Sequence, residues 1–516
     1  MAPANIGLFW EFFNRADGRR MGTRWLVATM VTAGILYLLA ADGQLDPNGD
    51  SPRFVMLARN LASGGGYVVD FTPEIHPESQ IPYGYPLLLT PAVLLLGPRA
   101  YAGFELISLA AMVLAVWASW IWLRQWMPEW EAPAVVTICA LLAECQTYAV
   151  SITTEASYLA ASFLCLWSME KITTAKAISA RDWGLFFILL GVAFHLRIIG
   201  IALLLALCIA LIVRQRWLQA LLAAIVGALA CAPWLLRLWQ HGLGYAQEFE
   251  QATPSAGALI YRVGYNAAAN IAKSLPDLFT YPFLTAVLPY GGLFPLKAAL
   301  GLVLFGLITA GFWRRLKPCG AAASGRLTRI LRDLSVSEIY FLTYLAICTS
   351  WTTHGDRYLL PVVPVLVWLL LKGAGRYRSQ VAALLMIVGF LGCSYGAVRV
   401  RAHMRTQEEL GFLEAASWLR EHAAAGDLVM SRHPAWIACV NGQRGIRWED
   451  SFDADVQRRA LVRNRIRWVV ADHNKVFRYT GSQHLAGLLE TYAGDFALRY
   501  QSTQDPPARV YEFTGH

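Results

Sequence analysis

Residues 46–86 read DPNGDSPRFVMLARNLASGGGYVVDFTPEIHPESQIPYGYP and form a polar, Gly- and Pro-rich segment between two strongly apolar regions. Asp50-Ser51-Pro52 predicts the start of a helix, because Asp is a good N-cap and Pro is tolerated in the first turn. Gly64–Gly66 predicts its end, and the run between them places four apolar residues on one face: Phe54, Leu57, Ala58 and Leu61. This pattern is typical of a short amphipathic helix that lies along a membrane surface.

The position of Asp50 supports two interpretations. The local pattern favours a structural N-cap, whose side-chain oxygen accepts a hydrogen bond from the first turn of the helix. A carboxylate beside a bilayer is also a candidate for chemistry, and the rest of the chain bears on that choice.

The composition indicates a membrane protein. The chain has 516 residues, of which 56% are hydrophobic and 15% charged, a balance typical of a polytopic membrane protein. The formal net charge of +9 does not require a nucleic-acid partner, because basic residues between spans orient membrane proteins.

Hydropathy predicts about eleven membrane-spanning helices, several of them short. They are expected near residues 24–41, 100–123, 132–150, 155–170, 183–196, 198–213, 217–236, 284–313, 337–353, 358–372 and 380–398.

The apolar segment 85–97, YPLLLTPAVLLLG, decides the topology. If it does not cross, the basic clusters of alternate loops all lie on the side of the N-terminal arginines, whereas a crossing would turn every cluster outward. The positive-inside rule therefore favours a re-entrant or surface helix. The N-terminus is then cytoplasmic, while segment 46–86 and residues beyond 400 lie outside, as in a bacterial inner membrane with a periplasmic C-terminal part. The clusters are Lys171/Lys176/Arg181, Arg214/Arg216, Arg314/Arg315/Lys317 and Lys372/Arg376/Arg378.

Beyond residue 400 the composition changes to that of a small α/β domain. Helices are expected at 407–424 and 484–492, and strands at 427–431, 467–472, 496–501 and 508–513. We therefore divide the chain into a transmembrane domain, 1–400, with an outer loop at 42–99, and a soluble extracytoplasmic domain, 401–516.

Charged residues recur at the predicted outer ends of spans, where they are costly and mark functional sites by default. Singly, Glu155 is explained as an interfacial residue, and Arg197 as a member of a structural ion pair. Arg357 opens a span beside Asp356 and His354, while Glu144 lies deeper and can bond to a neighbouring helix. Together these carboxylates and arginines suit an anionic, lipid-linked substrate.

The order of these features resembles the GT-C superfamily of membrane glycosyltransferases. Within it, the likeness is to the branch with protein O-mannosyltransferases and the lipid A aminoarabinose transferase. The matching pieces are GDSPRFVMLARNLASGGGY, IPYGYPLLL, ITTE at a span start, LRIIG, DRYLLPVVP and a soluble C-terminal part. The chain departs from the pattern at Asp50-Ser51, where many relatives carry an acidic pair, so the requirement for a divalent metal stays open.

The resemblance implies roles for individual residues. Asp50 would be the general base or would position the acceptor, and Glu155 would be the second acidic residue. Arg197 and Arg357 would bind the phosphate of a polyprenyl-phosphate sugar. Further residues would line the substrate: Arg53, Arg59, His76, Tyr83, Tyr85, His354, Asp356 and Tyr358.

The expected function is an inverting transfer of a sugar from a polyprenyl-phosphate donor to an acceptor hydroxyl at the outer membrane face. The acceptor is a lipid, a glycan or a protein, and the sequence decides neither the acceptor nor the sugar. Two alternatives stay open. A transporter or flippase of lipid-linked sugars usually shows repeated halves, which this sequence lacks. A non-catalytic membrane assembly protein does not explain the recurrence of charges at one face.

Overall fold

The computed structural model describes residues 18–46, 49–127, 131–175, 177–242, 249–250, 253, 255–280, 294–316, 332–351, 355–401, 406–424, 426–449, 451–473 and 480–515. Contacts divide the chain into two compact units, and each is described by itself. The first unit comprises residues 1–42, 79–85 and 105–401. The second comprises residues 43–78, 86–104 and 402–516, so it joins most of the outer loop to the C-terminal part of the chain.

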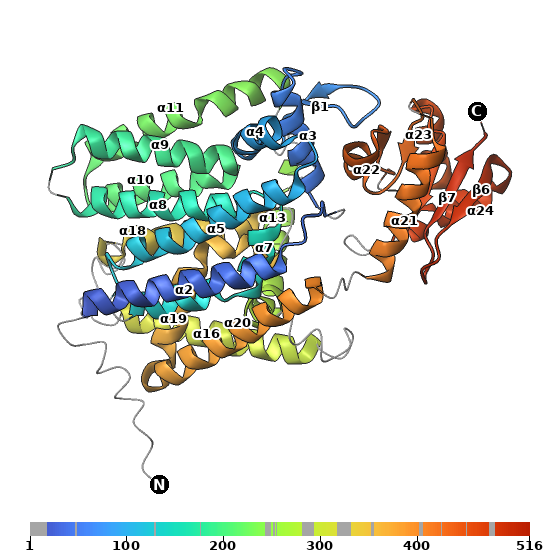
Figure 1. The fold of residues 1–516 in the computed structure, drawn as a ribbon. Helices are drawn as coiled ribbons and strands as arrows, with labels where there is room; N and C mark the ends of the chain where they lie inside the picture. Colours follow the sequence, from blue (N-terminus) through green and yellow to red (C-terminus); the bar gives the residue numbers. More distant parts are fainter. Residues whose placement is uncertain are drawn as a thin grey trace, which may run out of the picture. The chain divides into compact units, whose positions relative to one another are not determined.

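The apolar part of the chain is helical (Figure 1). Its helices are α2 (Gly18–Ala40), α4 (Gly84–Leu96), α5 (Tyr101–Leu123), α6 (Glu131–Ala140), α7 (Ala143–Val150), α8 (Glu155–Thr174), α9 (Ala180–Leu196), α10 (Ile201–Val213), α11 (Trp217–His241), α13 (Ala256–Ala269), α14 (Leu275–Thr280), α16 (Phe294–Leu316), α18 (Val336–Ser350), α19 (Val363–Ala374) and α20 (Arg378–Arg401). Short helical turns, η1 (Ile198–Gly200), η3 (Asp356–Tyr358) and η4 (Leu360–Val362), precede α10 and α19.

Among the described residues, five helical stretches are long and apolar enough to cross a membrane: Gly22–Ala40, α5, α11, α16 and the stretch Leu360–Val400. The pair α6 and α7, bent by 58°, makes a sixth if it counts as one span. Every predicted span contains a helix, although residues 284–293 lie outside the described part of the chain. The chain is therefore a multi-pass membrane protein, and the expected number of crossings stays a prediction.

Helix α4 occupies the apolar segment that decided the predicted topology. It has 13 residues, with Pro91 inside, and is shorter than the roughly 20 residues that a crossing needs. Because α10, which fills a predicted span, also has 13 residues, the length of α4 does not decide the question, and its position stays a prediction.

The helices of the first unit pack as long neighbours. Figure 1 shows α8, α9, α10 and α11 side by side, and α2 packs against α6, α7 and α20. Helices α16 and α19 approach most closely where Gly311 and Gly373 face the partner backbone, and neither position has room for a Cβ. Small residues at such points let the two backbones come together.

The loop part of the second unit contains the predicted amphipathic helix. Helix α3 (Ser51–Ala62) forms where it was predicted and buries Phe54, Leu57 and Ala58 of the expected face, whereas Leu61 is half-buried. Val55 and Met56 are buried as well, so the helix is covered on more than one face, and its position at a membrane surface stays a prediction. Strands β1 (Val68–Val69) and β2 (His76–Pro77) follow as an antiparallel pair.

The C-terminal part of the second unit contains α21 (Gln407–His422), β3 (Val429–Met430), α22 (Pro434–Asn441), β4 (Gly445–Ile446), α23 (Ala454–Arg463), β5 (Trp468–Ala471), α24 (Gly481–Thr491), β6 (Phe496–Gln501) and β7 (Arg509–Phe513). The five strands form one sheet in the order β4-β3-β5-β7-β6. Strands β4, β3 and β5 run parallel, and β7 and β6 are antiparallel additions at one edge. Met430, Leu461, Val469 and Leu485 are fully buried in its core.

Hydrogen bonds tie the loop to the C-terminal residues within this unit. Arg59 Nη1 donates to the carbonyl of Cys439 at 2.8 Å, and Trp436 Nε1 donates to that of Leu45 at 3.2 Å. The Gly445 N–H donates to the carbonyl of Phe71 at 2.8 Å. Helix α22 also packs against α3, so the C-terminal residues support the helix that Asp50 precedes.

Candidate active site

The first unit pairs two of the predicted site residues. Glu155 begins α8, and Arg197 follows the last residue of α9 with an extended backbone (φ −150°, ψ 129°) that ends the helix. Arg197 Nη1 lies 2.5 Å from Glu155 Oε1, and the side chains are 18% and 6% exposed, respectively. Two helix ends that meet thus create a nearly buried ion pair.

Aromatic rings and a second arginine complete the cluster. The Arg197 guanidinium lies 6.0 Å from the ring centre of Tyr158 and 5.6 Å from that of Tyr358. Arg357 Nη2 donates to the hydroxyl of Tyr358 at 2.9 Å, so Tyr358 contacts both cations. Two guanidinium groups thus gather at one tyrosine beside Glu155, and such groups are suited to bind a phosphate.

Asp356, in the same turn η3, faces another carboxyl group. Its side chain lies near that of Glu144 in α7, so two carboxyl groups from distant parts of the chain come together here. Nearby, Asp277 forms an ion pair with Lys297 at 2.5 Å. His354, the other predicted residue of this turn, lies outside the described residues.

The segment Tyr83-Gly84-Tyr85 is clamped beside the end of α9. A Cβ on Gly84 would lie 2.5 Å from the carbonyl oxygen of His195, so only glycine fits there without displacement. Tyr83 packs edge-on against Trp234 at 5.1 Å, and the hydroxyl of buried Tyr85 hydrogen-bonds to Ser108 at 2.7 Å. Gly84 therefore constrains the backbone two residues before Arg197.

In the second unit, Asp50 occupies the N-cap position of α3 but makes no side-chain capping hydrogen bond. Its backbone carbonyl accepts from the N–H of Phe54 at 3.1 Å. The Asp50 side chain therefore does not cap α3, which the local pattern had favoured. A role of this carboxylate in chemistry stays a prediction.

The other predicted loop residues differ in their surroundings. Arg53 forms a two-pronged contact with the buried carboxylate of Glu78, with both hydrogen bonds at 2.9 Å. Arg59 spreads its guanidinium over the carbonyls of Pro98 and Cys439 and the hydroxyl of Tyr101. His76 is exposed in β2. Arg53 and Arg59 hold the loop together, and their contact with substrate stays a prediction.

Sequence reasoning missed Tyr158, which follows Glu155 by one turn and lies beside Arg197. Its i+3 spacing from Glu155 was the signal that could have found it. Glu144, which the sequence analysis named as a charge that can bond to a neighbouring helix, lies near Asp356. Among the described residues, no three His, Cys, Asp or Glu side chains gather in a way that would hold a metal ion.

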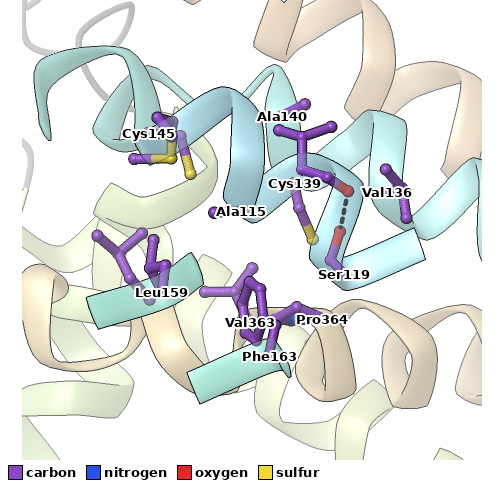
Figure 2. Close-up of a pocket in the computed structure, with 13 residues that line it drawn as sticks. Ala115, Ser119, Val136, Cys139, Ala140, Cys145, Leu159, Phe163, Val363 and Pro364 are labelled. Atoms are coloured by element: carbon purple, nitrogen blue, oxygen red, sulfur yellow. Dashed lines mark hydrogen bonds between the residues drawn. The ribbon is translucent and has the colours of Figure 1, made fainter. Parts of the chain in front are cut away.

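A small apolar cavity lies beside this cluster. It has a volume of about 20 Å³ and is lined by residues of α5, α6, α7, α8, η4 and α19 (Figure 2). Leu159 and Phe163 line it at positions i+4 and i+8 from Glu155, so it lies further along the same face of α8. The hydroxyl of Ser119 donates to the carbonyl of Val116 in its own helix, which leaves the lining apolar. The cavity has room for one water molecule and not for a sugar.

No family model matches the sequence, and no curated protein sequence does. Solved structures do match. ArnT from Cupriavidus metallidurans, in a crystal structure with undecaprenyl phosphate bound, is 13% identical with a TM-score of 0.57; the match covers 96% of this chain and 98% of that one. The apo oligosaccharyltransferase of Archaeoglobus fulgidus is 12% identical with a TM-score of 0.57, over 87% of this chain and 69% of that one. Because these proteins are GT-C glycosyltransferases, the chain has the GT-C fold, as the sequence motifs predicted.

Proposed function

We propose that the chain is a membrane glycosyltransferase that moves a sugar from a polyprenyl-phosphate donor to an acceptor hydroxyl. The carrying observation is that the guanidinium groups of Arg197 and Arg357 gather at Tyr358, beside Glu155, within a GT-C fold. A cationic cluster near an apolar bilayer suits a phosphate on a lipid tail, because arginine binds phosphate through a planar fork and stays charged.

The proposed step is a single displacement. The acceptor oxygen attacks the anomeric carbon, the bond from that carbon to the phosphate oxygen breaks, and polyprenyl phosphate leaves with the electron pair. Arg197 and Arg357 stabilise the charge that develops on the departing phosphate. Asp50 takes the proton of the acceptor hydroxyl. Attack from the face opposite the leaving group inverts the anomeric centre.

Glu155 holds Arg197 in this proposal. A carboxylate that is paired at 2.5 Å is a poor proton acceptor, and its contact fixes the guanidinium in one orientation. The reaction takes place at the outer face of a bacterial inner membrane, with the N-terminus in the cytoplasm and residues 401–516 outside it. No step is assigned to a metal ion.

The test is an assay with the purified full chain in lipid nanodiscs and a panel of undecaprenyl-phosphate sugars. Formation of undecaprenyl phosphate together with a glycosylated acceptor, and loss of both in the Arg197→Ala variant, would support the proposal. Movement of intact donor across proteoliposome membranes without release of undecaprenyl phosphate would instead indicate a carrier. If the protein bound none of the donors, both the transferase and the carrier function would be contradicted.

A further inference from the structure

Helix α22 connects the C-terminal part of the second unit to the outer loop. It packs against α21 and β4 of the C-terminal part and against α3 of the loop. All of these elements belong to the same compact unit. Because α22 contacts both parts, its place on α21 and the sheet also decides where α3 lies.

Two side chains fix α22 to α21. The ring of Trp436 packs edge-on against that of Phe412, with ring centres 5.4 Å apart, and Trp436 is 7% exposed. At the other end of the helix, the side-chain amide of Asn441 donates to the carbonyl of Ala416 at 2.8 Å. Since close-packed interiors have little free volume, α22 has one well-defined position on α21.

Arg59 of α3 joins three segments of the unit through one guanidinium group. Its Nε donates to the carbonyl of Pro98 and its Nη1 to the carbonyl of Cys439 in α22, both at 2.8 Å. Its Nη2 donates to the same carbonyl of Pro98 and, at 3.2 Å, to the hydroxyl of Tyr101. A planar group that donates to several oxygens at once has a fixed orientation, so Arg59 fixes α3 relative to α22.

The contact uses the end of α22 at which a positive charge is favourable. Cys439 and Val440 lie in the last turn of this helix, where backbone carbonyls lack partners within the helix itself. Arg59 donates to the first of these carbonyls, and Arg99 Nη2 donates to the second at 3.4 Å. Cations at a helix C-terminus are also stabilised by the helix dipole. Helix α22 thus supplies acceptors for two arginines of the outer loop.

A second contact with α22 lies on the other side of Asp50 in the chain. Trp436 Nε1 donates to the carbonyl of Leu45 at 3.2 Å, and Leu45 is 4% exposed. Leu45 precedes Asp50, whereas Arg59 follows it in α3. The two contacts with α22 therefore flank Asp50. The helix between Asp50 and Arg59 is stiff, because its backbone hydrogen bonds are internal.

We infer that α22 positions the proposed general base, with Arg59 as the positioning residue. The inference rests on the proposed function, in which Asp50 takes the proton of the acceptor hydroxyl. A general base must lie within hydrogen-bond reach of that proton. Without the hydrogen bonds of Arg59, α3 can shift on α22, and a displacement of about 1 Å can cost about 10²-fold in rate. The C-terminal part of the chain thus contributes to the rate without touching the substrate.

The test compares variants of the full chain in nanodiscs, with a donor and an acceptor that the wild-type protein uses. We expect Arg59→Ala to lower kcat about tenfold or more, while the donor affinity and the KM of the acceptor stay unchanged. Arg59→Lys should restore part of kcat, because an ammonium group can donate to these oxygens but lacks the planar fork. Trp436→Phe removes the indole N–H and keeps a ring against Phe412, so it should also lower kcat.

Arg458→Ala is the matched control. Arg458 is another arginine of the second unit that donates to a backbone carbonyl, that of Gly515, and it also pairs with Asp495. These partners lie in the C-terminal part, so its loss should leave kcat unchanged even where it lowers the unfolding temperature. Thermal unfolding shows which variants fold, and Trp436→Phe tests the contact between α22 and the loop if Arg59→Ala does not fold.

A double variant separates positioning of the base from a general loss of structure. If Arg59 acts through Asp50, Arg59→Ala should not reduce the single-turnover rate further in the Asp50→Asn background, because no base is then left to misplace.

Three outcomes would overturn the inference. The first is a normal kcat in both Arg59→Ala and Trp436→Phe, and the second is a rate loss that adds in full to that of Asp50→Asn. The third is a raised KM of the acceptor at unchanged kcat, which would assign Arg59 to acceptor binding. The wild-type protein tests the proposed function separately: inactivity with every donor contradicts that function, whereas an active wild type and an equally active Arg59→Ala variant contradict only the inference.

Discussion

Arg197 donates to Glu155 across the gap between the end of α9 and the start of α8, at 2.5 Å. Neither residue is near the other in the sequence, and each taken singly had a structural explanation. The pair makes Glu155 the counter-ion that orients Arg197, and Arg357 donates to the hydroxyl of Tyr358 beside it.

The Glu155–Arg197 pair predicts strong coupling. Glu155→Gln or Arg197→Gln leaves one buried charge without its partner, so each should destabilise the protein by about 3–5 kcal/mol. The double variant should be more stable than the sum of the two losses implies, because no charge is then left alone. Thermal unfolding of the four proteins in nanodiscs measures this. Additive losses would mean that the two residues act separately.

Arg357→Ala should weaken donor binding by about 1.5–3 kcal/mol, the usual value for a lost charged hydrogen bond. Arg357→Lys should restore only part of the affinity, because lysine lacks the planar fork. Arg376→Ala is a matched control, since Arg376 also donates to the tyrosine that follows it, Tyr377, but is exposed. Equal donor affinity in the Arg357→Ala and wild-type proteins, measured by binding of a labelled donor, would assign Arg357 to structure alone.

Asp50→Asn separates chemistry from capping. If Asp50 is the general base, the rate should fall by about 10²–10⁴ while the donor still binds, because an amide cannot take the proton. Asp453→Asn is the control, since Asp453 does cap α23 through hydrogen bonds from Asp455 and Val456, and Asn caps as well as Asp. Near-normal turnover of Asp50→Asn in single-turnover kinetics would move the search for the base elsewhere.

Gly84→Ala should impair the proposed reaction. The new Cβ would lie 2.5 Å from the carbonyl oxygen of His195, so the end of α9 must shift next to Arg197. A displacement of about 1 Å in a positioning group can cost about 10²-fold in rate. Gly184, in α9 itself, is the control: a Cβ there would meet nothing within 4 Å, so Gly184→Ala should leave the rate unchanged. Turnover of the two variants is compared, and equal rates would exclude a positioning role for Gly84.

The topology prediction rests on the basic clusters and on α4, which has 13 residues. A reporter that is active only outside the cytoplasm should be active when it is fused to the C-terminus. The same reporter fused after Arg216, in a predicted cytoplasmic loop, should be inactive. The opposite pattern would show that the segment 85–97 crosses the membrane.

The sequence predicted those helices and strands whose signals, such as caps, proline and apolar spacing, lie within one short segment. Helix α3 begins at Ser51 after Asp50 and ends before the glycines at 64–66, because cap, proline and apolar spacing lie within one segment. The membrane helices follow from hydropathy, and β5, β6 and β7 from runs of apolar and β-branched residues. The elements α22, β4 and α23 were missed, since a two-residue strand such as β4 contains no period to recognise.

The sequence by itself determined that the chain enters a membrane, where most of its apolar helices lie, and which charged residues deserve a functional interpretation. Only the tertiary structure decided which charges meet. Glu155 pairs with Arg197, Glu144 lies near Asp356, and Arg432 lies beside Asp472 and Trp448. The reason is physical: hydropathy and helix propensity act on neighbours in the chain, whereas an ion pair forms only where packing brings two distant segments to the same depth and excludes water from both.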